Sequence, residues 1–178
     1  MNLDSLLAAI RAEYALSWDG IHGIAHWRRV CENGLRLAAQ TGAQIAVVEC
    51  FAYLHDSRRL NDGSDPDHGR RGAELARALY RADRLGVDNG DGTLGLDEER
   101  IELLVYACTH HTDGLTEADV TVQTCWDADR LDLGRVGIVP DPDLLCTSAA
   151  RDAAIREWAW RRSREGQVWK LAGDHDHS

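Results

Sequence analysis

Apolar residues recur along this chain at steps of three and four, the spacing that places side chains on one face of an α-helix. The clearest stripe is formed by Ile24, Trp27, Cys31, Leu35 and Ala38. The segments 101–108 and 122–133 repeat the pattern. Polar residues fill the intervening positions, as expected for helices that bury one face and expose the other. No segment shows the alternation that predicts a half-buried β-strand.

One segment is apolar almost throughout and needs a different argument. Residues 45–54 read IAVVECFAYL, which is compatible with a buried strand or a buried helix. The apolar stretch runs for about 12 residues from Ala43 to His55 and has no hairpin partner, so a buried helix is the better prediction.

Capping signals set the predicted helix boundaries. Thr41-Gly42 predicts a helix end, while Asp65-Pro66, Thr116-Glu117 and Ser148 predict helix starts. We expect an all-α, compact helical bundle of about seven helices that forms one domain over residues 1–178. Its core lies within about 20–135, and a C-terminal helix over 148–166 packs on it. The predicted helices cover 2–16, 21–40, 43–56, 67–84, 97–111, 117–133 and 148–166.

Composition and charge narrow the class of protein. The chain has 178 residues, of which 44% are apolar and 28% charged, a balance typical of soluble globular proteins. With 20 Lys and Arg against 30 Asp and Glu, the net charge of −10 disfavours binding to nucleic-acid polymers and anionic membranes. A small phosphorylated ligand stays compatible with this charge, because a metal ion and a few arginines reverse the local field.

The cysteines and the N-terminus bear on the compartment. The five cysteines are odd in number, spread along the chain and without a C-x-x-C pair, which favours reduced thiols in a cytoplasm. The first apolar run, Leu6 to Ile10, is too short for a signal peptide or a membrane span. A single lysine, Lys170, among the basic residues suggests GC-rich coding and a bacterial source.

Two acidic segments resemble metal sites superficially. Residues 88–99 are acidic and glycine-rich, but glycines stand where a calcium loop needs oxygen ligands, so we expect a solvated turn. The tail with His175 and His177 is expected to be a frayed terminus.

His55 and Asp56 carry the first chemical signal, because they follow the most apolar helix directly. Burying an imidazole beside a carboxylate is costly unless both have partners. A capping aspartate and a satisfied core histidine would explain one such pair. Asp129 favours a metal site instead, because the helical pattern points it inward, whereas Asp127 lies about 200° around the helix. Asp127 is kept as the alternative ligand.

His26 lies in the middle of the helix predicted over 21–40, and His22 precedes it by one turn. Two histidines at positions i and i+4 face the same way, which suits two ligands or one ligand and a supporting partner. A helix-start role for His22 stays open.

The order of these residues resembles the HD-domain metal-dependent phosphohydrolase superfamily. A His followed by x-x-Arg-Val, a His-Asp pair closing an apolar helix, and Ala-Asp-Arg-Leu on a late helix carry the likeness from about His22 to Leu133. The resemblance implies metal ligands at His26, His55, Asp56 and Asp129. HGIAHWRRV, FAYLHDSRRLND, HGRRGAELA and CWDADRLDLGRVG are more narrowly similar to small bacterial HD proteins.

Further histidines raise the question of a second metal ion. His68 resembles the helix-start histidine of two-metal HD proteins, and His110-His111 resembles the paired histidine of the branch that hydrolyses cyclic dinucleotides. That branch is not expected here, since no Glu follows His111 and no G-Y-P triplet occurs. His22, His68, His110 and His111 are therefore candidates for a second metal or for substrate binding. If they bind no metal, His68, His110 and His111 would contact the substrate phosphate or donate protons.

The residue types suggest the chemistry. Neutral imidazoles and carboxylates suit Mn, Fe, Co, Zn or Mg, with one or two ions per chain. A bound cation lowers the pKa of water and so supplies a nucleophile near neutral pH. We assign catalytic roles to Asp56, Arg59, His110 and His111, with Arg59 binding the phosphoryl group and Arg130 as a weaker alternative.

The sequence thus predicts a metal-dependent phosphohydrolase for a small phosphorylated metabolite, with a nucleotide as the expected substrate. Two alternatives are an HD-type diiron oxygenase and a non-catalytic nucleotide-binding regulatory module. The sequence makes no prediction of the oligomeric state.

Overall fold

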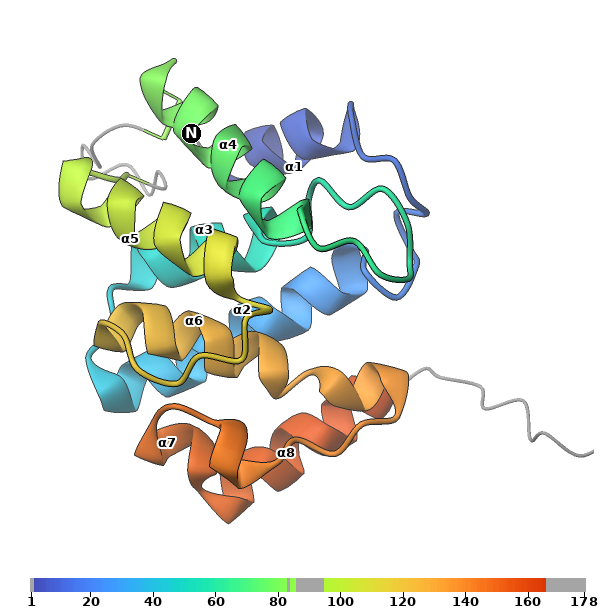
Figure 1. Ribbon diagram of the computed structural model, residues 1–178, viewed down its shortest axis with the longest axis vertical. Coiled ribbons are helices and arrows are strands. Elements are labelled where there is room, and N and C mark those ends of the chain that lie inside the picture. Colours follow the sequence, from blue (N-terminus) through green and yellow to red (C-terminus); the bar gives the residue numbers. More distant parts are fainter. Residues whose placement is uncertain (1, 83, 86–94, 166–178) are drawn as a thin grey trace, which may run out of the picture.

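The computed structural model describes residues 2–82, 84–85 and 95–165, and every regular element within these ranges is helical (Figure 1). The predicted all-α fold is confirmed. Residues 88–94 of the glycine-rich segment, and the tail with His175 and His177, lie outside the described residues. The α-helices are α1 (Leu3–Arg11), α2 (Ile24–Thr41), α3 (Ile45–Leu54), α4 (His68–Arg81), α5 (Glu98–His110), α6 (Val120–Arg130), α7 (Ser148–Arg151) and α8 (Ala153–Arg164). Two short 3₁₀ helices, η1 (Leu133–Val136) and η2 (Pro142–Leu144), lie between α6 and α7.

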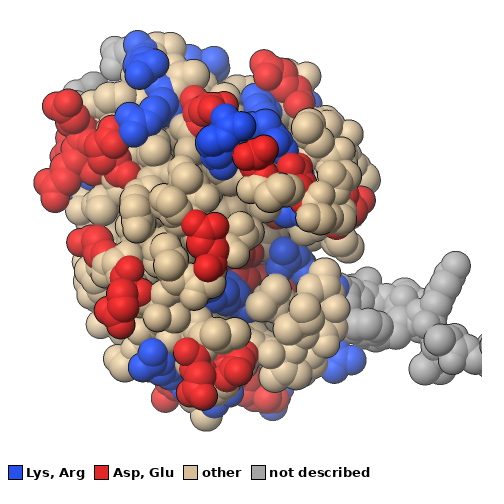
Figure 2. All heavy atoms as spheres, viewed as in Figure 1, with Lys and Arg blue, Asp and Glu red and all other residues tan. Residues whose placement is uncertain are grey.

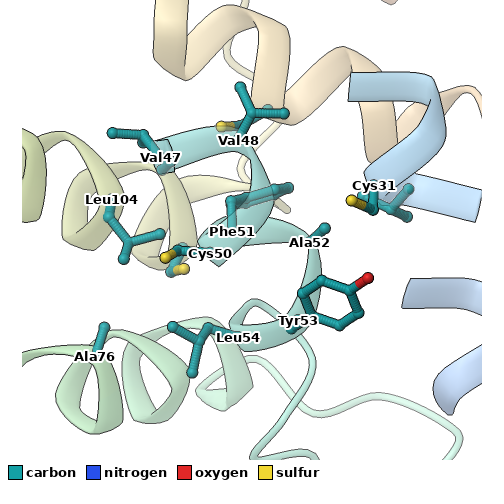
Figure 3. Close-up of a cluster of buried hydrophobic side chains, with 14 of the residues drawn as sticks. Cys31, Val47, Val48, Cys50, Phe51, Ala52, Tyr53, Leu54, Ala76 and Leu104 are labelled. Atoms are coloured by element: carbon teal, nitrogen blue, oxygen red, sulfur yellow. The ribbon is translucent and has the colours of Figure 1, made fainter. Parts of the chain in front are cut away.

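Helix α3 is the centre of the fold, and it contacts α2, α4, α5 and α6. Its side chains are buried on several sides, which explains why its sequence lacks a polar face. In Figure 3, Val48 and Leu54 point to different sides of α3, and Cys50 lies beside Leu104 of α5. The continuous apolar run of residues 45–54 is therefore a buried helix, as predicted. The last turn of α3 delivers His55 and Asp56 into the interior of the bundle.

The helix boundaries differ from the predictions where capping groups intervene. The helix predicted over 148–166 is two helices, because the carboxylate of Asp152 accepts the N–H groups of Ala154 and Ile155 and starts α8. Helix α6 begins at Val120 after its cap Asp119, whose carboxylate accepts the N–H of Thr121.

Helices α7 and α8 pack on the rest of the chain through a second apolar cluster. Leu37 of α2 and Leu131 at the end of α6 contact Leu145, Ile155 and Ala159 there. The C-terminal helical segment thus packs against α2 and the end of α6. Within the described ranges, no helix has the length and apolar character needed to cross a bilayer.

The surface mixes charges of both signs. In Figure 2, acidic and basic side chains are interspersed over the face shown, with tan residues between them. Several of these charges are paired across the surface, such as Arg77 with Glu102 and Arg70 with Glu74. The net negative charge is thus not concentrated as one acidic field on this face.

Candidate metal centre

Three helices bring together the first group of predicted ligands. His26 comes from α2, His55 follows α3, and Asp129 lies in the last turn of α6. The Nε2 atoms of His26 and His55 are 3.1 Å apart. The Oδ1 atom of Asp129 lies 3.5 Å from the first and 3.7 Å from the second. These three side chains can place one atom each around a single ion.

A second group of potential ligands lies beside the first and includes Asp56. It consists of Asp56, His68 at the start of α4, and His111 directly after α5. The Nε2 atoms of His68 and His111 are 2.9 Å apart. The Oδ1 atom of Asp56 lies 3.1 Å from Nε2 of His68 and 3.8 Å from Nε2 of His111. All three residues are buried.

Asp56 faces both groups, one with each carboxylate oxygen. While Oδ1 points at the second group, Oδ2 lies 3.6 Å from Nε2 of His26 and 3.8 Å from Nε2 of His55. Both distances exceed a hydrogen bond and leave space between the donor atoms. A carboxylate in this position can bridge two cations.

The protons of the first two imidazoles are fixed by their outer partners. Nδ1 of His26 lies 2.7 Å from Oδ2 of Asp132, and Nδ1 of His55 lies 3.1 Å from the carbonyl oxygen of Phe51. Since a carbonyl or a carboxylate only accepts, we assign the N–H to Nδ1 in both rings. Each Nε2 therefore presents a lone pair toward the group.

The second pair of imidazoles follows the same rule. Nδ1 of His111 lies 2.7 Å from the carbonyl oxygen of Cys108, and Nδ1 of His68 donates to the carbonyl oxygen of Asp65. Again the lone pairs on Nε2 face each other, in this case at 2.9 Å. Two lone pairs at such a distance repel unless a positive charge lies near both.

The donor set fits divalent cations. Oδ1 of Asp129 is buried without a hydrogen-bond partner, although a buried carboxylate oxygen ordinarily has one. A cation among Asp129, His26 and His55 would satisfy this oxygen and both lone pairs together. The combination of neutral imidazole and carboxylate suits Mn, Fe, Co or Zn.

The electrostatics of the two groups favour the protonation states that bind metal, namely neutral imidazoles and an ionised carboxylate. Burial holds the pKa of His26 well below its usual value and also lowers the pKa of His55, so both rings are neutral at pH 7. Burial alone would raise the pKa of Asp56. The neighbouring imidazoles of His55, His111, His22 and His68 outweigh burial and hold that pKa well below its usual value. Asp56 is therefore an anion between two sets of imidazoles.

Asp132 supports the centre from outside, although the sequence reasoning did not single it out. Besides accepting from His26, its carboxylate pairs with Arg29 through Nε at 2.6 Å and Nη2 at 3.0 Å. A carboxylate behind a ligating imidazole fixes the ring and raises its basicity. A signal was present, because Asp132 follows Asp129 by three residues and projects about 60° away from it around the helix.

The structure separates Asp127 from Asp129. The carboxylate of Asp127 accepts from the backbone N–H of Cys146 at 2.7 Å and from both the N–H and the hydroxyl of Thr147 at 2.8 Å. Burial raises its pKa, and these three donors counter that effect. Asp127 therefore anchors the segment before α7, and the structure brings Asp129 rather than Asp127 to the metal groups.

Of the adjacent pair His110 and His111, the structure brings only His111 to the centre. His110 lies outside both groups, with Nδ1 2.7 Å from the Asp113 carboxylate and its ring beside Tyr106. Successive helical residues point about 100° apart, and here only the second of the two neighbours faces the centre. The structure therefore does not bring His110 to either metal group. His22 does reach the centre, since its Nδ1 lies 2.9 Å from Oδ2 of Asp56.

The two predicted arginines differ in place. Nη1 of Arg59 lies 3.4 Å from Oδ1 of Asp56 and 3.1 Å from Nε2 of His68, so its positive charge borders the second group. Arg130 instead donates to the carbonyl oxygens of Leu144 at 2.7 Å and Leu115 at 2.6 Å. Arg130 therefore braces two loops and is not directed at either metal group.

Two glycines allow α4 to deliver His68. A Cβ atom at Gly72 would lie 2.4 Å from the carbonyl oxygen of Leu54, and one at Gly69 would lie 2.3 Å from that of Cys108. Helix α4 thus approaches the end of α3 and the end of α5 more closely than a larger residue would permit. This contact explains the small residues of the segment HGRRGAELA.

No protein-family model and no curated protein matches the chain. A solved structure does: the crystal structure of a predicted HD superfamily hydrolase from an uncultured Thermotogales bacterium. The two chains are 25% identical and superpose with a TM-score of 0.65, over 89% of this chain and 85% of the other. The resemblance to the HD-domain superfamily expected from the sequence is confirmed by this structural match.

Proposed function

We propose that this protein is a metal-dependent phosphohydrolase that acts on a small phosphorylated metabolite, with nucleotides as the first class to examine. One observation carries the proposal: two groups of buried imidazole and carboxylate donors share Asp56 and direct unprotonated Nε2 atoms inward. The similar bacterial protein described as a predicted HD superfamily hydrolase supports the hydrolytic part. We propose two divalent ions per chain, one for each group.

A divalent cation bound here would lower the pKa of water and neutralise phosphoryl charge. The chain's own residues prepare for that chemistry. Asp132 and the carbonyl oxygens of Phe51 and Cys108 hold the protons of three rings on Nδ1. His22 and Arg59 contact Asp56 and keep its two oxygens directed at opposite groups. Because Arg59 borders the second group, it also places positive charge beside an incoming phosphoryl group.

The test is release of phosphate or pyrophosphate from a panel of nucleotides and sugar phosphates by protein loaded with Mn²⁺, Co²⁺ or Mg²⁺. His55→Ala and Asp56→Ala should abolish turnover, because each removes a metal donor. The matched pair His111→Ala and His110→Ala should differ: the first loses activity, and the second keeps it because His110 lies outside both groups. Absence of release from every phosphoester would refute the proposal, and ligand binding without turnover would indicate a regulatory binding module.

A diiron oxygenase is the second candidate, since two histidine and carboxylate groups that share one carboxylate also suit two iron ions. Elemental analysis separates the two functions. Two irons per chain with dioxygen consumption would favour the oxygenase, and ions other than iron would remove it. We propose that the protein binds a small phosphorylated substrate rather than a nucleic-acid polymer or a membrane. We also propose that it acts in the cytoplasm.

A further inference from the structure

A pocket opens directly beside the metal groups. It has a volume of about 340 Å³, and its lining includes His111 of the second group and Asp129 of the first. The pocket lies between the segment after α5 and the segment that runs from η1 through η2. A molecule that occupies it therefore has one end beside a donor of each group.

The walls of this pocket are apolar. They are formed by Leu133, Ile138, Val139, Pro140, Leu144 and Leu145. Three of these side chains are largely exposed: Val139 by 66%, Leu144 by 57% and Ile138 by 53%. Apolar side chains gathered and exposed at the rim of a site are typical of a surface that is covered when a ligand binds.

The charges around the pocket do not suit a chain of phosphates. Among the described residues of the lining, Arg130 is the single Lys or Arg. Its guanidinium donates to the carbonyl oxygens of Leu144 and Leu115, and so joins the opposite walls. Asp141, whose carboxylate accepts from the N–H of Asp143, adds negative charge to the rim. A second or third phosphate in this pocket would lose hydration without gaining a dedicated cation.

We propose that the pocket holds the leaving group of the substrate, and that this group is uncharged and largely apolar. The substrate class is then phosphate monoesters of apolar alcohols rather than nucleoside polyphosphates. This inference rests on the proposed phosphohydrolase function. In the reaction, water adds to phosphorus, the P–O ester bond breaks, and the alcohol leaves with a proton, without any redox change. A volume near the small end of ligand pockets fits a leaving group of one ring or a short chain.

A homologous series of n-alkyl phosphates from ethyl to hexyl tests the proposal. The leaving alcohols differ little in acidity, so a trend in kcat/KM reports on apolar contact. We expect kcat/KM to rise by up to about fourfold for each methylene until the pocket is filled, the factor that corresponds to burying one CH₂ group. Adenosine triphosphate should be a poorer substrate than adenosine monophosphate. A kcat/KM that does not change along the alkyl series would overturn the proposal.

Exposed positions supply variants that should fold. Val139→Asp and Leu144→Asp place a charge on the wall and should remove most of the gain per methylene. Val136→Asp is the matched control, because Val136 is also exposed in the same region but does not line the pocket. Val136→Asp should keep both the hydrolytic activity and the rise in kcat/KM for each methylene. An equal loss of the gain in all three variants would contradict the assignment.

A binding measurement separates the failure of this proposal from the failure of the proposed function. If no phosphoester is hydrolysed, calorimetry of n-alkylphosphonates with the metal-loaded protein still tests the pocket. Affinity that rises with chain length supports it, and affinity independent of chain length overturns it. Sedimentation adds a further outcome: a wild-type dimer that Leu144→Asp converts to a monomer would make this surface an interface between copies and overturn the proposal.

Discussion

A substitution at Asp132 gives the most quantitative test of the proposed metal centre. Its carboxylate is 1% exposed, accepts the Nδ1–H of His26 at 2.7 Å, and pairs with Arg29 through two hydrogen bonds. Asp132→Asn preserves the shape of the side chain but removes the charge and one accepting oxygen. The one remaining oxygen cannot serve both His26 and Arg29, and the negative charge behind the imidazole is lost.

The size of the effect follows from these contacts. Removing the partner behind a ligating imidazole weakens metal binding by about 10- to 100-fold, or about 1.4–2.7 kcal/mol. The metal-free protein should also lose stability, because Arg29 keeps its charge without a buried counterion. Since the Arg29 side chain is 18% exposed and water solvates it in part, we expect about 1–3 kcal/mol rather than the full cost of an unpaired buried charge.

Competition between the protein and a fluorescent chelator for Mn²⁺ or Zn²⁺ measures the affinity, and urea unfolding in excess chelator measures the stability. The control is Asp127→Asn on the same helix, whose carboxylate anchors Cys146 and Thr147 away from the centre. It should lower stability and leave metal affinity unchanged. Wild-type metal affinity in Asp132→Asn, or a loss of metal affinity in Asp127→Asn, would refute the reasoning.

Three further predictions address the packing, the protonation and the cationic border of the centre. Gly72→Ala should cost about 1–3 kcal/mol in thermal or urea unfolding and weaken metal binding, since its Cβ would meet the carbonyl oxygen of Leu54 at 2.4 Å; wild-type stability would contradict the close approach of α4. The free energy of unfolding of the metal-free protein should fall as the pH drops below about 6.5, because the unfolded chain then binds protons that the buried rings of His26 and His55 resist. The pKa of His111 is raised, so this ring alone would make the folded protein more stable on acidification. Because two rings have lowered pKa values and one has a raised pKa, we expect a net loss of stability. Unfolding curves that show rising stability on acidification would contradict neutral buried ligands. Arg59→Ala should reduce kcat/KM for a phosphoester by about 10- to 100-fold, as expected for loss of a hydrogen bond to a charged group, whereas an unchanged value would remove Arg59 from the site.

Much of the fold was predictable from the sequence because helical periodicity is a local property. The apolar stripes of α2, α5 and α6 and the continuous apolar run of α3 correspond directly to buried faces. The break at Asp152 was not predicted, since the residues around it are good helix formers and the sequence reads as one helix. The break depends on an extended backbone at Asp152, which allows its carboxylate to cap α8.

The metal groups were predictable where a polar residue interrupts an apolar stripe. This applies to Asp129, whereas His55 was singled out because it closes the most apolar helix and His26 because of the family resemblance. The structure brings these three residues together. The choice between His110 and His111 was also contained in the pattern, because the stripe Ile101, Leu104, Cys108 continues at steps of three and four to His111. The division of the ligands into two groups was not predictable from the sequence, because it depends on how α4 packs against α3 and α5 in three dimensions.

The central claim is that the chain holds two divalent cations that share Asp56. Elemental analysis of the purified protein, compared with Asp56→Asn prepared in the same way, tests it most directly. The account predicts two divalent ions per chain in the wild type and a clear loss of metal in the variant. Metal-free wild-type protein that also takes up no Mn²⁺, Co²⁺ or Zn²⁺ on dialysis would contradict it.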